Sequence, residues 1–401
     1  MAKLRQHFTG VAAKYLSKVD ATRNSHQHEI GSNAFARILG EPGQLTVPID
    51  SVLYYFADDL DEPLRASATL SWYDVRRYNP NRSPEYRLYY PDNIVTARMT
   101  EGDFCIVAAR PNNTLMIIVA PSGSTIERQL RWLFDIDNIG SDRFTTHEIE
   151  PGKDVSMIEA LILEELGVEV RQDDESWLDR IIGQFGGDSF PSTVQFSGFA
   201  RQTCGNGFDV RREPDAALMA WMGHEEMLFR TLERYIVQRQ LDAGFTDVDH
   251  FIKISLSVQN RRKSRVGHAL EHHLAAVFSE IGLPYERQVV TENRATADFL
   301  FPSAAAYQDP YYPDDQLVML ASKSTCKDRW RQVLAEARRL PNKHLFTLEP
   351  AISDHQTAEM QAHGLQLVVP RQLMDTYSAG QQGWLYDLSS YVDFVRHRLR
   401  V

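Results

Sequence analysis

Between residues 45 and 120, short runs of β-branched and aromatic residues alternate with turn-forming stretches rich in Pro, Gly and Asn. Runs of this length and composition are typical of β-strands, and closely spaced turns join such strands into antiparallel barrels and sandwiches. The pattern therefore predicts a β-rich, barrel-like domain in the first part of the chain. The six expected strands cover residues 45–49, 51–56, 67–73, 86–90, 103–109 and 114–120.

The second half of the chain has a different pattern, in which helical segments alternate with short apolar strands. Apolar residues between Val266 and Ile281 recur at the spacing of one helix face. Such alternation predicts an α/β domain with a mixed sheet covered by helices on both faces. Helices are expected at 157–166, 216–240 and 328–340 and from about 260 to 281, and strands at 298–301, 317–322, 344–348 and 365–369.

These two patterns predict the domain organisation. A β-rich domain is expected over residues 1–140 and an α/β domain over residues 181–401. The stretch between them, 141–180, has a looser pattern and is predicted to be a linker.

Charge and hydropathy restrict the class of protein. The chain has 43 Lys and Arg against 54 Asp and Glu, a formal charge of −11, so phosphate is attracted only by a local basic surface. Its apolar stretches, such as 115–120 and 216–222, are far shorter than the roughly 18 residues that span a bilayer. No secretory signal pattern is present at the start. We therefore expect a cytoplasmic protein without membrane contact.

The three cysteines, Cys105, Cys204 and Cys326, are far apart and form no Cys-x-x-Cys pair. This spacing argues against a disulfide framework and against a thiolate zinc site. Each is expected to be a buried or half-buried small side chain.

An acidic residue and a lysine lie at the ends of two predicted strands. Asp298 opens one strand, and Lys323 ends the next, so the two side chains can meet at one end of the sheet. There a carboxylate binds Mg²⁺, and a lysine orients water and counters phosphodiester charge. This is the logic of the nuclease pattern Pro-Asp…(Asp/Glu)-x-Lys, although an Asp and a Lys at this separation also occur by chance.

The acidic position two residues before Lys323 is occupied by Ala321, so one metal ligand of that pattern is missing. Glu336, on the helix expected from 328, is a candidate to replace it. The alternative is an exposed helical carboxylate paired with Arg338 or Arg339.

Two basic clusters stand out in this acidic chain. Arg261, Arg262 and Lys263 begin the helix that carries Glu271, where they fit phosphate contacts or an ordinary solvated helix start. Residues 323–339 hold six Lys and Arg against two acids, a local net charge of +4.

In the first domain, Arg76, Arg77 and Arg82 are interleaved with aromatic residues between Trp72 and Arg87. That loop fits a DNA grip, or equally a hairpin with aromatics packed inward and arginines outward.

The motifs of the second half, taken together, are similar to a known family. The run 257–267 with Asn260-Arg-Arg-Lys263, then Ala297-Asp-Phe-Leu-Phe301, then Lys323-Ser-Thr-Cys-Lys-Asp-Arg329 and His344-Leu-Phe-Thr-Leu348 resemble the catalytic domain of the EcoRII-type restriction endonucleases. The likeness is close over about residues 251–350 and weaker on both sides.

This resemblance implies a type II, Mg²⁺-dependent endonuclease of the PD-(D/E)xK type, with an α/β/α fold, that cuts double-stranded DNA as a homodimer. Asp298, Lys323 and Glu336 match its catalytic carboxylate, lysine and displaced glutamate. Asp298 and Glu336 are then metal ligands, and Glu271 matches a helix acid that assists a second metal. Tyr307 matches a tyrosine near the active site, with a packed aromatic as the alternative.

In the same family the segment after the catalytic lysine reads bases. Lys327 and Arg329 suit guanine, Asp328 suits cytosine, and Arg331 suits a phosphate. The implied site contains C·G pairs and is of the CC(A/T)GG kind. The stretch around His26 is similar to a DNA-contacting arm of the family's N-terminal domain, which implies a β-rich DNA-binding or effector domain.

Two other classes of function stay open from the sequence. One is a DNA-binding regulator with a vestigial nuclease domain, and the other is a structure-selective DNA repair nuclease. The second would not need a base-reading turn at Lys327, Asp328 and Arg329.

Overall fold

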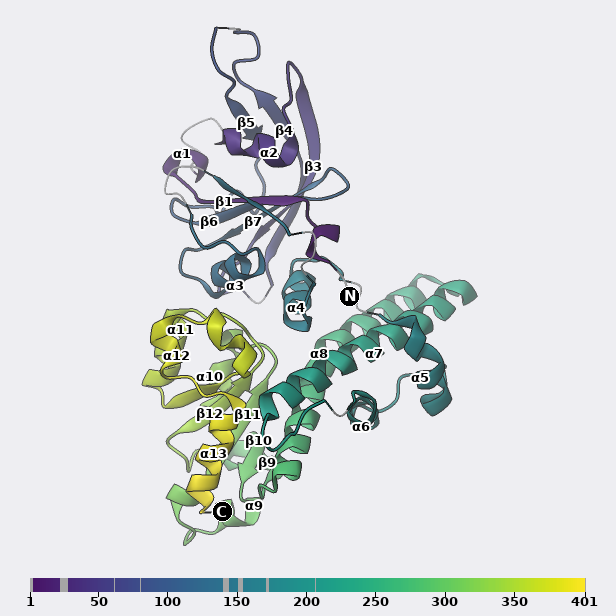
Figure 1. The fold of residues 1–401 in the computed structure, drawn as a ribbon, viewed down its shortest axis with the longest axis vertical. Coiled ribbons are helices and arrows are strands. Elements are labelled where there is room, and N and C mark those ends of the chain that lie inside the picture. The colour runs from purple at the N-terminus through teal and green to yellow at the C-terminus, as the bar shows by residue number, and fades with distance from the viewer. Residues whose placement is uncertain are drawn as a thin grey trace. The chain divides into compact units, whose positions relative to one another are not determined.

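The computed structural model describes residues 3–21, 28–60, 62–79, 81–139, 144–150, 154–170, 173–205 and 207–400. The chain divides into two compact units: unit 1 holds residues 1–155, 159–170 and 351–353, and unit 2 holds 156–158, 171–350 and 354–401. Figure 1 shows that unit 1 is built mainly of strands and that unit 2 combines a sheet with long helices. The predicted α/β class and the β-rich first domain are therefore confirmed.

Unit 1 contains a curled eight-stranded sheet in the order β2-β5-β4-β3-β7-β6-β1-β8 (Figure 1). Most neighbours are antiparallel, but β3 and β7 are parallel, which departs from the predicted all-antiparallel arrangement. The sequence pattern also missed β1, β2 and β8. The strands are β1 (Gly10–Tyr15), β2 (Glu29–Gly31), β3 (Thr46–Tyr55), β4 (Leu64–Asp74), β5 (Tyr86–Tyr89), β6 (Phe104–Ala109), β7 (Leu115–Ala120) and β8 (Thr145–Glu148).

Strands β6 and β7 of unit 1 are buried on both faces, which explains their unbroken apolar sequences. Along β6, Phe104 and Ile106 enter one apolar core, and Cys105 and Val107 enter the other. The first core also includes helices α3 (Thr125–Leu133) and α4 (Met157–Glu165). Short helical segments α1 (Lys18–Ala21) and α2 (Ala36–Leu39) complete this unit.

The segment predicted to be a linker, residues 141–180, carries regular structure of its own. Its strand β8 pairs with β1, and α4, which was expected at 157–166, contributes Ile162 and Leu163 to the first core of unit 1. Further along, α5 (Leu178–Phe185) belongs to unit 2. The division between the two units therefore falls near residue 170.

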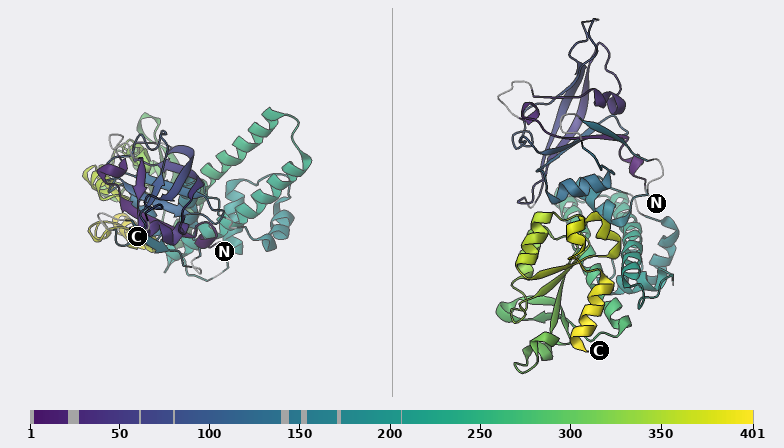
Figure 2. Two further views of the ribbon diagram at one scale, coloured as in Figure 1. Left: turned by 90° about the horizontal axis from the view of Figure 1, so that it is seen from above. Right: turned by 60° about the vertical axis from the view of Figure 1, so that its left-hand side comes forward.

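Unit 2 is organised around a five-stranded mixed sheet in the order β13-β12-β11-β10-β9. Antiparallel pairing joins β9, β10 and β11, and parallel pairing joins β11, β12 and β13. Figure 2 shows the helices packed around this sheet. The strands are β9 (Glu286–Val290), β10 (Thr296–Phe301), β11 (Val318–Lys323), β12 (Lys343–Thr347) and β13 (Leu365–Val368).

Two long helices, α7 (Pro214–Ala243) and α8 (Val248–Ile281), lie side by side as a pair (Figure 2). The Asp247 side chain caps the start of α8, and Gly282 ends it in the left-handed conformation. The predicted helix start near Asn260 is therefore wrong, because the cap lies thirteen residues earlier and Asn260 falls inside the helix.

The remaining helices of unit 2 are short, apart from α13. They are α6 (Thr193–Thr203), α9 (Ala304–Gln308), α10 (Trp330–Val333), α11 (Asp354–Ala362), α12 (Ala379–Gln382) and α13 (Leu388–Leu399), with 3₁₀ turns η5 (Glu292–Arg294), η6 (Asp314–Gln316), η7 (Lys327–Arg329) and η8 (Arg371–Thr376). The helix predicted over 328–340 is instead η7, α10 and an irregular turn, in which Ala337 has a φ of +41°.

An aromatic cluster packs α8 and α13 against one face of the sheet. The Phe278 ring of α8 lies 5.3 Å from both Phe299 and Phe301 of β10, measured between ring centroids, and 6.4 Å from Tyr391 of α13. Because side chains alternate along a strand, Asp298 points to the opposite face from Phe299. This alternation keeps a charged residue at 298 out of the aromatic core.

No helix among the described residues has the length and apolar character of a membrane span. Cys105 and Cys326 are buried and Cys204 is half-buried, and all three are free thiols, as the sequence predicted.

Candidate active site

Asp298 and Lys323 meet at one end of the sheet of unit 2. β10 begins two residues before Asp298 and the antiparallel β11 ends at Lys323, so the pairing of the two strands brings these residues together. The Lys323 Nζ atom lies 3.1 Å from Asp298 Oδ2, which also accepts a 2.8 Å hydrogen bond from the Ser322 backbone N–H. Asp298 is only 6% exposed. The structure thus holds a buried carboxylate against an ammonium group, at the place that the strand pattern predicted.

Gln288 links Asp298 to a third acidic residue. Its Nε2 atom donates to Asp298 Oδ1 at 3.2 Å and to Glu271 Oε2 at 3.0 Å. Gln288 has a φ of +52°, which turns its side chain out of the regular alternation of β9. Arg287 also approaches Glu271, at 3.2 Å. The sequence analysis missed Gln288, because nothing in a single sequence signals a left-handed residue inside a strand.

Glu336 lies in the turn after α10 and is 8% exposed. Its pKa is raised to about 7, mainly because burial disfavours the charged carboxylate; Lys323 opposes this effect and Asp298 adds to it. Glu336 Oε2 is buried and has no hydrogen-bond partner among the described residues. Glu336 therefore lies within the electrostatic reach of Asp298 and Lys323, and it has an oxygen available for a ligand.

The alternative reading of Glu336, an exposed carboxylate paired with Arg338 or Arg339, is wrong. Arg339 forms its ion pair with Asp314 at 2.7 Å. The backbone N–H of Arg338 donates to Glu292 at 3.0 Å. Glu336 points inward because it lies in a turn and not on the solvent-facing side of a continuous helix.

Tyr307 is buried on α9, at 6% exposure, and its hydroxyl donates to both carboxylate oxygens of Glu292 at 2.7 Å. Burial and this hydrogen bond raise the pKa of Tyr307 well above its usual value. Burial alone would raise the pKa of Glu292, but the bonds from Tyr307 and from the backbone hold it below its usual value. The hydrogen bonds of Tyr307 thus connect it to Glu292 and to the turn that carries Glu336.

The predicted base-reading residues lie on η7, directly after β11. Arg329 is exposed and Lys327 is half-buried, with a φ of +33°; the side chain of Asp328 lies outside the described structure. Glu349, which follows β12, accepts hydrogen bonds from the backbone N–H groups of Cys326 and Lys327. Glu349 was missed from the sequence, although its position just past a buried strand was a usable signal.

Arg331 lies on α10 and is half-exposed. Its Nη2 atom lies 2.9 Å from Glu359, and its guanidinium lies over the Trp330 ring at 4.6 Å. An exposed ion pair of this kind contributes little to stability.

The cluster at 261–263 lies within α8 and contacts neighbouring elements of unit 2. Arg262 makes a bidentate contact with the buried Glu233 of α7, from Nε at 2.9 and 2.8 Å. The Arg261 guanidinium lies 4.5 Å from the Phe190 ring, and Lys263 is exposed. Arg262 therefore has an internal partner that holds α7 and α8 together, which weighs against a role in binding phosphate.

In unit 1, Trp72 and Tyr86 are buried in the second apolar core, so part of the aromatic and arginine pattern is ordinary strand packing. The connection between β4 and β5 still carries Arg76, Arg77 and the exposed Arg82. Arg76 pairs with Glu85, and the Arg77 guanidinium lies 5.1 Å from the ring of Tyr78, which is 79% exposed. His26 lies outside the described residues.

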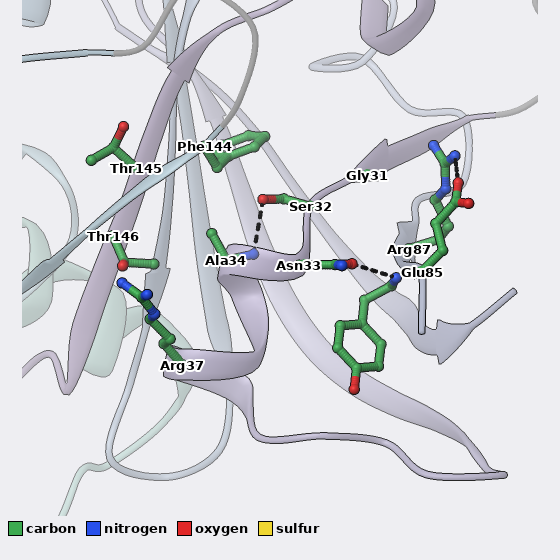
Figure 3. Close-up of a pocket in the computed structure, with 11 residues that line it drawn as sticks. Gly31, Ser32, Asn33, Ala34, Arg37, Glu85, Arg87, Phe144, Thr145 and Thr146 are labelled. Carbon is green, nitrogen blue, oxygen red and sulfur yellow. Dashed lines mark hydrogen bonds and ion pairs between the residues drawn. The ribbon is translucent and has the colours of Figure 1, made fainter. Parts of the chain in front are cut away.

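A pocket of about 730 Å³ opens beside this connection. Figure 3 shows that it lies between residues 31–34, residues 85–87 and residues 144–146, with Arg37 pointing toward it. Asn33 Oδ1 accepts from the Tyr86 backbone N–H at 3.1 Å, and Arg87 pairs with Glu85 (Figure 3). The pocket therefore has a polar, arginine-bearing wall.

The described residues contain no group of three or more His, Cys, Asp and Glu side chains arranged to hold a metal ion. Mg²⁺, however, is commonly held by one or two carboxylates, with water and substrate phosphate as its other ligands. Two buried carboxylates, one of which has an unsatisfied oxygen, fit that kind of site.

Part of unit 2, including the acid–lysine pair, is similar to a known protein family. Residues 229–392 match the family model described as EcoRII C terminal. The type II restriction enzyme EcoRII of Escherichia coli is 43% identical over 181 residues, which cover 45% of this chain and 45% of that enzyme. The predicted resemblance to the EcoRII-type restriction endonucleases is confirmed over this region. The chain aligns with less than half of the length of this relative.

Some solved structures are also similar. Two structures of metal-depleted Ecl18kI, in complex with uncleaved modified DNA and with uncleaved DNA, match with 14% identity and TM-scores of 0.47 and 0.46. Each match covers 57% of this chain and 85% of the other. The B3 domain of the UbaLAI restriction endonuclease with cognate DNA matches with 16% identity and a TM-score of 0.20, over 35% of this chain and 89% of that domain.

Proposed function

We propose that this chain is a type II restriction endonuclease, which hydrolyses phosphodiester bonds of double-stranded DNA at a short site with C·G pairs, of the CC(A/T)GG kind. The observation that carries this proposal is the buried contact of Asp298 with Lys323, with Glu336 in the same electrostatic environment. The 43% identity to EcoRII over 181 residues supports the class of enzyme. The kind of site rests on the resemblance alone.

Asp298 and Glu336 are the proposed ligands of Mg²⁺. The bound ion would polarise the scissile phosphodiester and lower the pKa of the attacking water. Two donors on Oδ2, the Ser322 N–H and the Lys323 Nζ, hold the Asp298 carboxylate in place for this task. Glu271, linked to Asp298 through Gln288, is the candidate ligand for a second ion.

Lys323 has a separate role. Its ammonium group is held 3.1 Å from Asp298 at the end of a buried strand, and its side chain is 21% exposed. A group in this position can counter the charge that builds up on the phosphodiester and can orient the attacking water. Its anchoring on β11 means that the charge needs little reorganisation when DNA binds.

For base recognition we propose the η7 turn. Arg329 and Lys327 would donate to guanine O6 and N7, Asp328 would accept from cytosine N4, and Arg331 would hold a phosphate. Glu349 supports this role, because its carboxylate anchors the backbone at the start of the turn.

A homodimer is part of this proposal. The two strands of a duplex run in opposite directions, so cutting both at a short symmetric site takes two active sites related by a two-fold axis. Each chain contributes one set of Asp298, Lys323 and Glu336. Light scattering of the purified protein tests this point, and a monomer on cognate DNA would contradict it.

Unit 1 is proposed to bind DNA as an effector domain. Arg76, Arg77 and Arg82, on the connection between β4 and β5, lie close in sequence to the pocket wall formed by residues 85–87. His26 is carried over from the resemblance. In the full chain made inactive by Asp298→Asn, replacing the three arginines by Ala should remove binding of a second duplex and leave one.

The central experiment is digestion of plasmid DNA with Mg²⁺, followed by sequencing of the ends. Discrete ends at one short site support the proposal, and Asp298→Asn is the control that should give none. Scattered ends would favour a structure-selective nuclease. Sequence-specific binding without any ends would favour a DNA-binding regulator with a vestigial nuclease domain.

A further inference from the structure

The first three residues after Glu336 are held by side chains and not by helical hydrogen bonds. The three consecutive backbone N–H groups that follow Glu336 each donate to a side-chain oxygen from another part of unit 2. The pairs are Ala337 to Thr291 Oγ1 at 3.2 Å, Arg338 to Glu292 Oε2 at 3.0 Å, and Arg339 to Tyr307 Oη at 3.3 Å. The three acceptors, Thr291, Glu292 and Tyr307, are called the clamp below.

The clamp residues also form hydrogen bonds with one another and with a nearby backbone carbonyl. The Tyr307 hydroxyl lies 2.7 Å from both oxygens of Glu292. Thr291 Oγ1 donates to the Ala295 carbonyl at 3.1 Å. Each acceptor therefore has a further hydrogen bond besides the one to the turn, which makes the clamp a rigid support.

Arg339 attaches the far end of the turn to a second part of unit 2. Its Nη1 atom donates to the carbonyls of Tyr307 at 2.5 Å and Asp309 at 2.7 Å, and its Nη2 atom donates to that of Tyr312 at 2.5 Å. Its Nε atom pairs with Asp314. The segment that follows Glu336 is thus tied down over all three of its residues.

We propose that Thr291, Glu292 and Tyr307 are positioning residues that fix the Glu336 carboxylate at the metal site. The backbone supports this role: Ala337, the residue after Glu336, has a φ of +41°, a conformation that non-glycine residues keep only when their surroundings enforce it. The inference rests on the proposed function, because that function makes Glu336 a metal ligand. It assigns Tyr307 a supporting role and adds two residues to the site.

The sharpest test replaces Thr291 by Val, which keeps the shape and removes the acceptor for the Ala337 N–H. Thr291→Ser keeps the acceptor and is the rescue variant. Tyr307→Phe is a second, independent test, and Tyr311→Phe is its matched control, since Tyr311 is four residues away and 93% exposed.

Two measurements are made on the full chain. Amide hydrogen exchange over residues 334–340 should accelerate in Thr291→Val and Tyr307→Phe. The affinity for Mn²⁺, measured by electron paramagnetic resonance, should fall by roughly fivefold in the same variants, because one ordinary hydrogen bond contributes a free energy of about that size. Thr291→Ser and Tyr311→Phe should match the wild type in both. If DNA is cleaved, the Mn²⁺ concentration needed for half-maximal rate should rise by the same factor.

Unchanged exchange and unchanged Mn²⁺ affinity in both test variants would overturn the proposal. So would equal losses in Thr291→Val and Thr291→Ser, because the hydroxyl would then have no special role. A wild-type protein that does not cut duplex DNA would refute the proposed function, but the exchange and Mn²⁺ measurements would still decide on the clamp.

Discussion

Replacing Glu336 by Gln tests whether this carboxylate is as costly to charge as its surroundings indicate. Burial raises the pKa of Glu336 to about 7 from an ordinary value of 4.5. A pKa shift of this size corresponds to a change of roughly 3 kcal/mol in the free-energy difference between the charged and the neutral carboxyl group. The protonated form is favoured in the folded protein, so this contribution to stability is fully present below pH 4.5 and is lost as the pH rises through about 7.

The Gln side chain has the shape of a protonated Glu and does not ionise. We therefore expect Glu336→Gln to be close to the wild type in stability near pH 5 and more stable by roughly 2 kcal/mol at pH 8. A divalent cation should reverse the order at pH 8, because it binds the charged wild-type site and stabilises the folded state by mass action.

The assay is urea denaturation of the full chain in a chelator at pH 5 and pH 8, each variant being compared with the wild type at the same pH. Glu280→Gln, at an exposed position on α8, is the matched control and should have no effect at either pH. A Glu336→Gln protein with the same stability difference from the wild type at both pH values would refute the reasoning. It would mean that Glu336 titrates as an exposed carboxylate does.

Three further outcomes are expected. Lys323→Ala should lower the cleavage rate by roughly two to three orders of magnitude in a single-turnover assay, while DNA binding, measured by gel shift, stays near normal; full activity would remove Lys323 from the chemistry. Arg329→Ala should lose roughly 1 to 3 kcal/mol of discrimination at one C·G pair in competition binding, whereas Arg331→Ala should weaken binding to all duplexes alike. Unchanged affinity ratios between cognate and single-base-variant duplexes in both proteins would mean that η7 reads no bases. Arg262→Ala should lower the free energy of unfolding by roughly 1 to 3 kcal/mol, because the buried carboxylate of Glu233 loses its bidentate partner and keeps Arg230, at 3.6 Å, as a nearby cation; a loss below about 0.5 kcal/mol would return Arg262 to the candidates for phosphate binding.

Much of the fold was predictable because it depends on local patterns. The β-rich first unit, four of the five strands of the second unit and α7 follow from residue types that repeat with the period of a strand or a helix, whereas β9 (Glu286–Val290) was missed. The meeting of Asp298 and Lys323 also followed, because adjacent antiparallel strands place the start of one beside the end of the other. The resemblance of residues 251–350 to EcoRII-type enzymes rested on short motifs that survive in sequence.

The features that the sequence did not reveal depend on contacts between distant residues. The helix expected over 328–340 breaks because Thr291, Glu292 and Tyr307 accept the N–H groups of its later residues. A local pattern contains no information about such acceptors.

Within the site, the amino-acid sequence by itself determined the strands that carry Asp298 and Lys323, because these follow from short-range periodicity, and it placed the two residues at strand ends that can meet. Only the tertiary structure decided that Glu336 is buried in a turn, that Gln288 bridges Asp298 and Glu271, and that Arg262 pairs with Glu233. In the sequence, each of these residues has many possible partners of suitable charge or hydrogen-bonding capacity. The physical reason is that burial and ion pairing are set by which elements pack together, and that packing is a property of the whole unit.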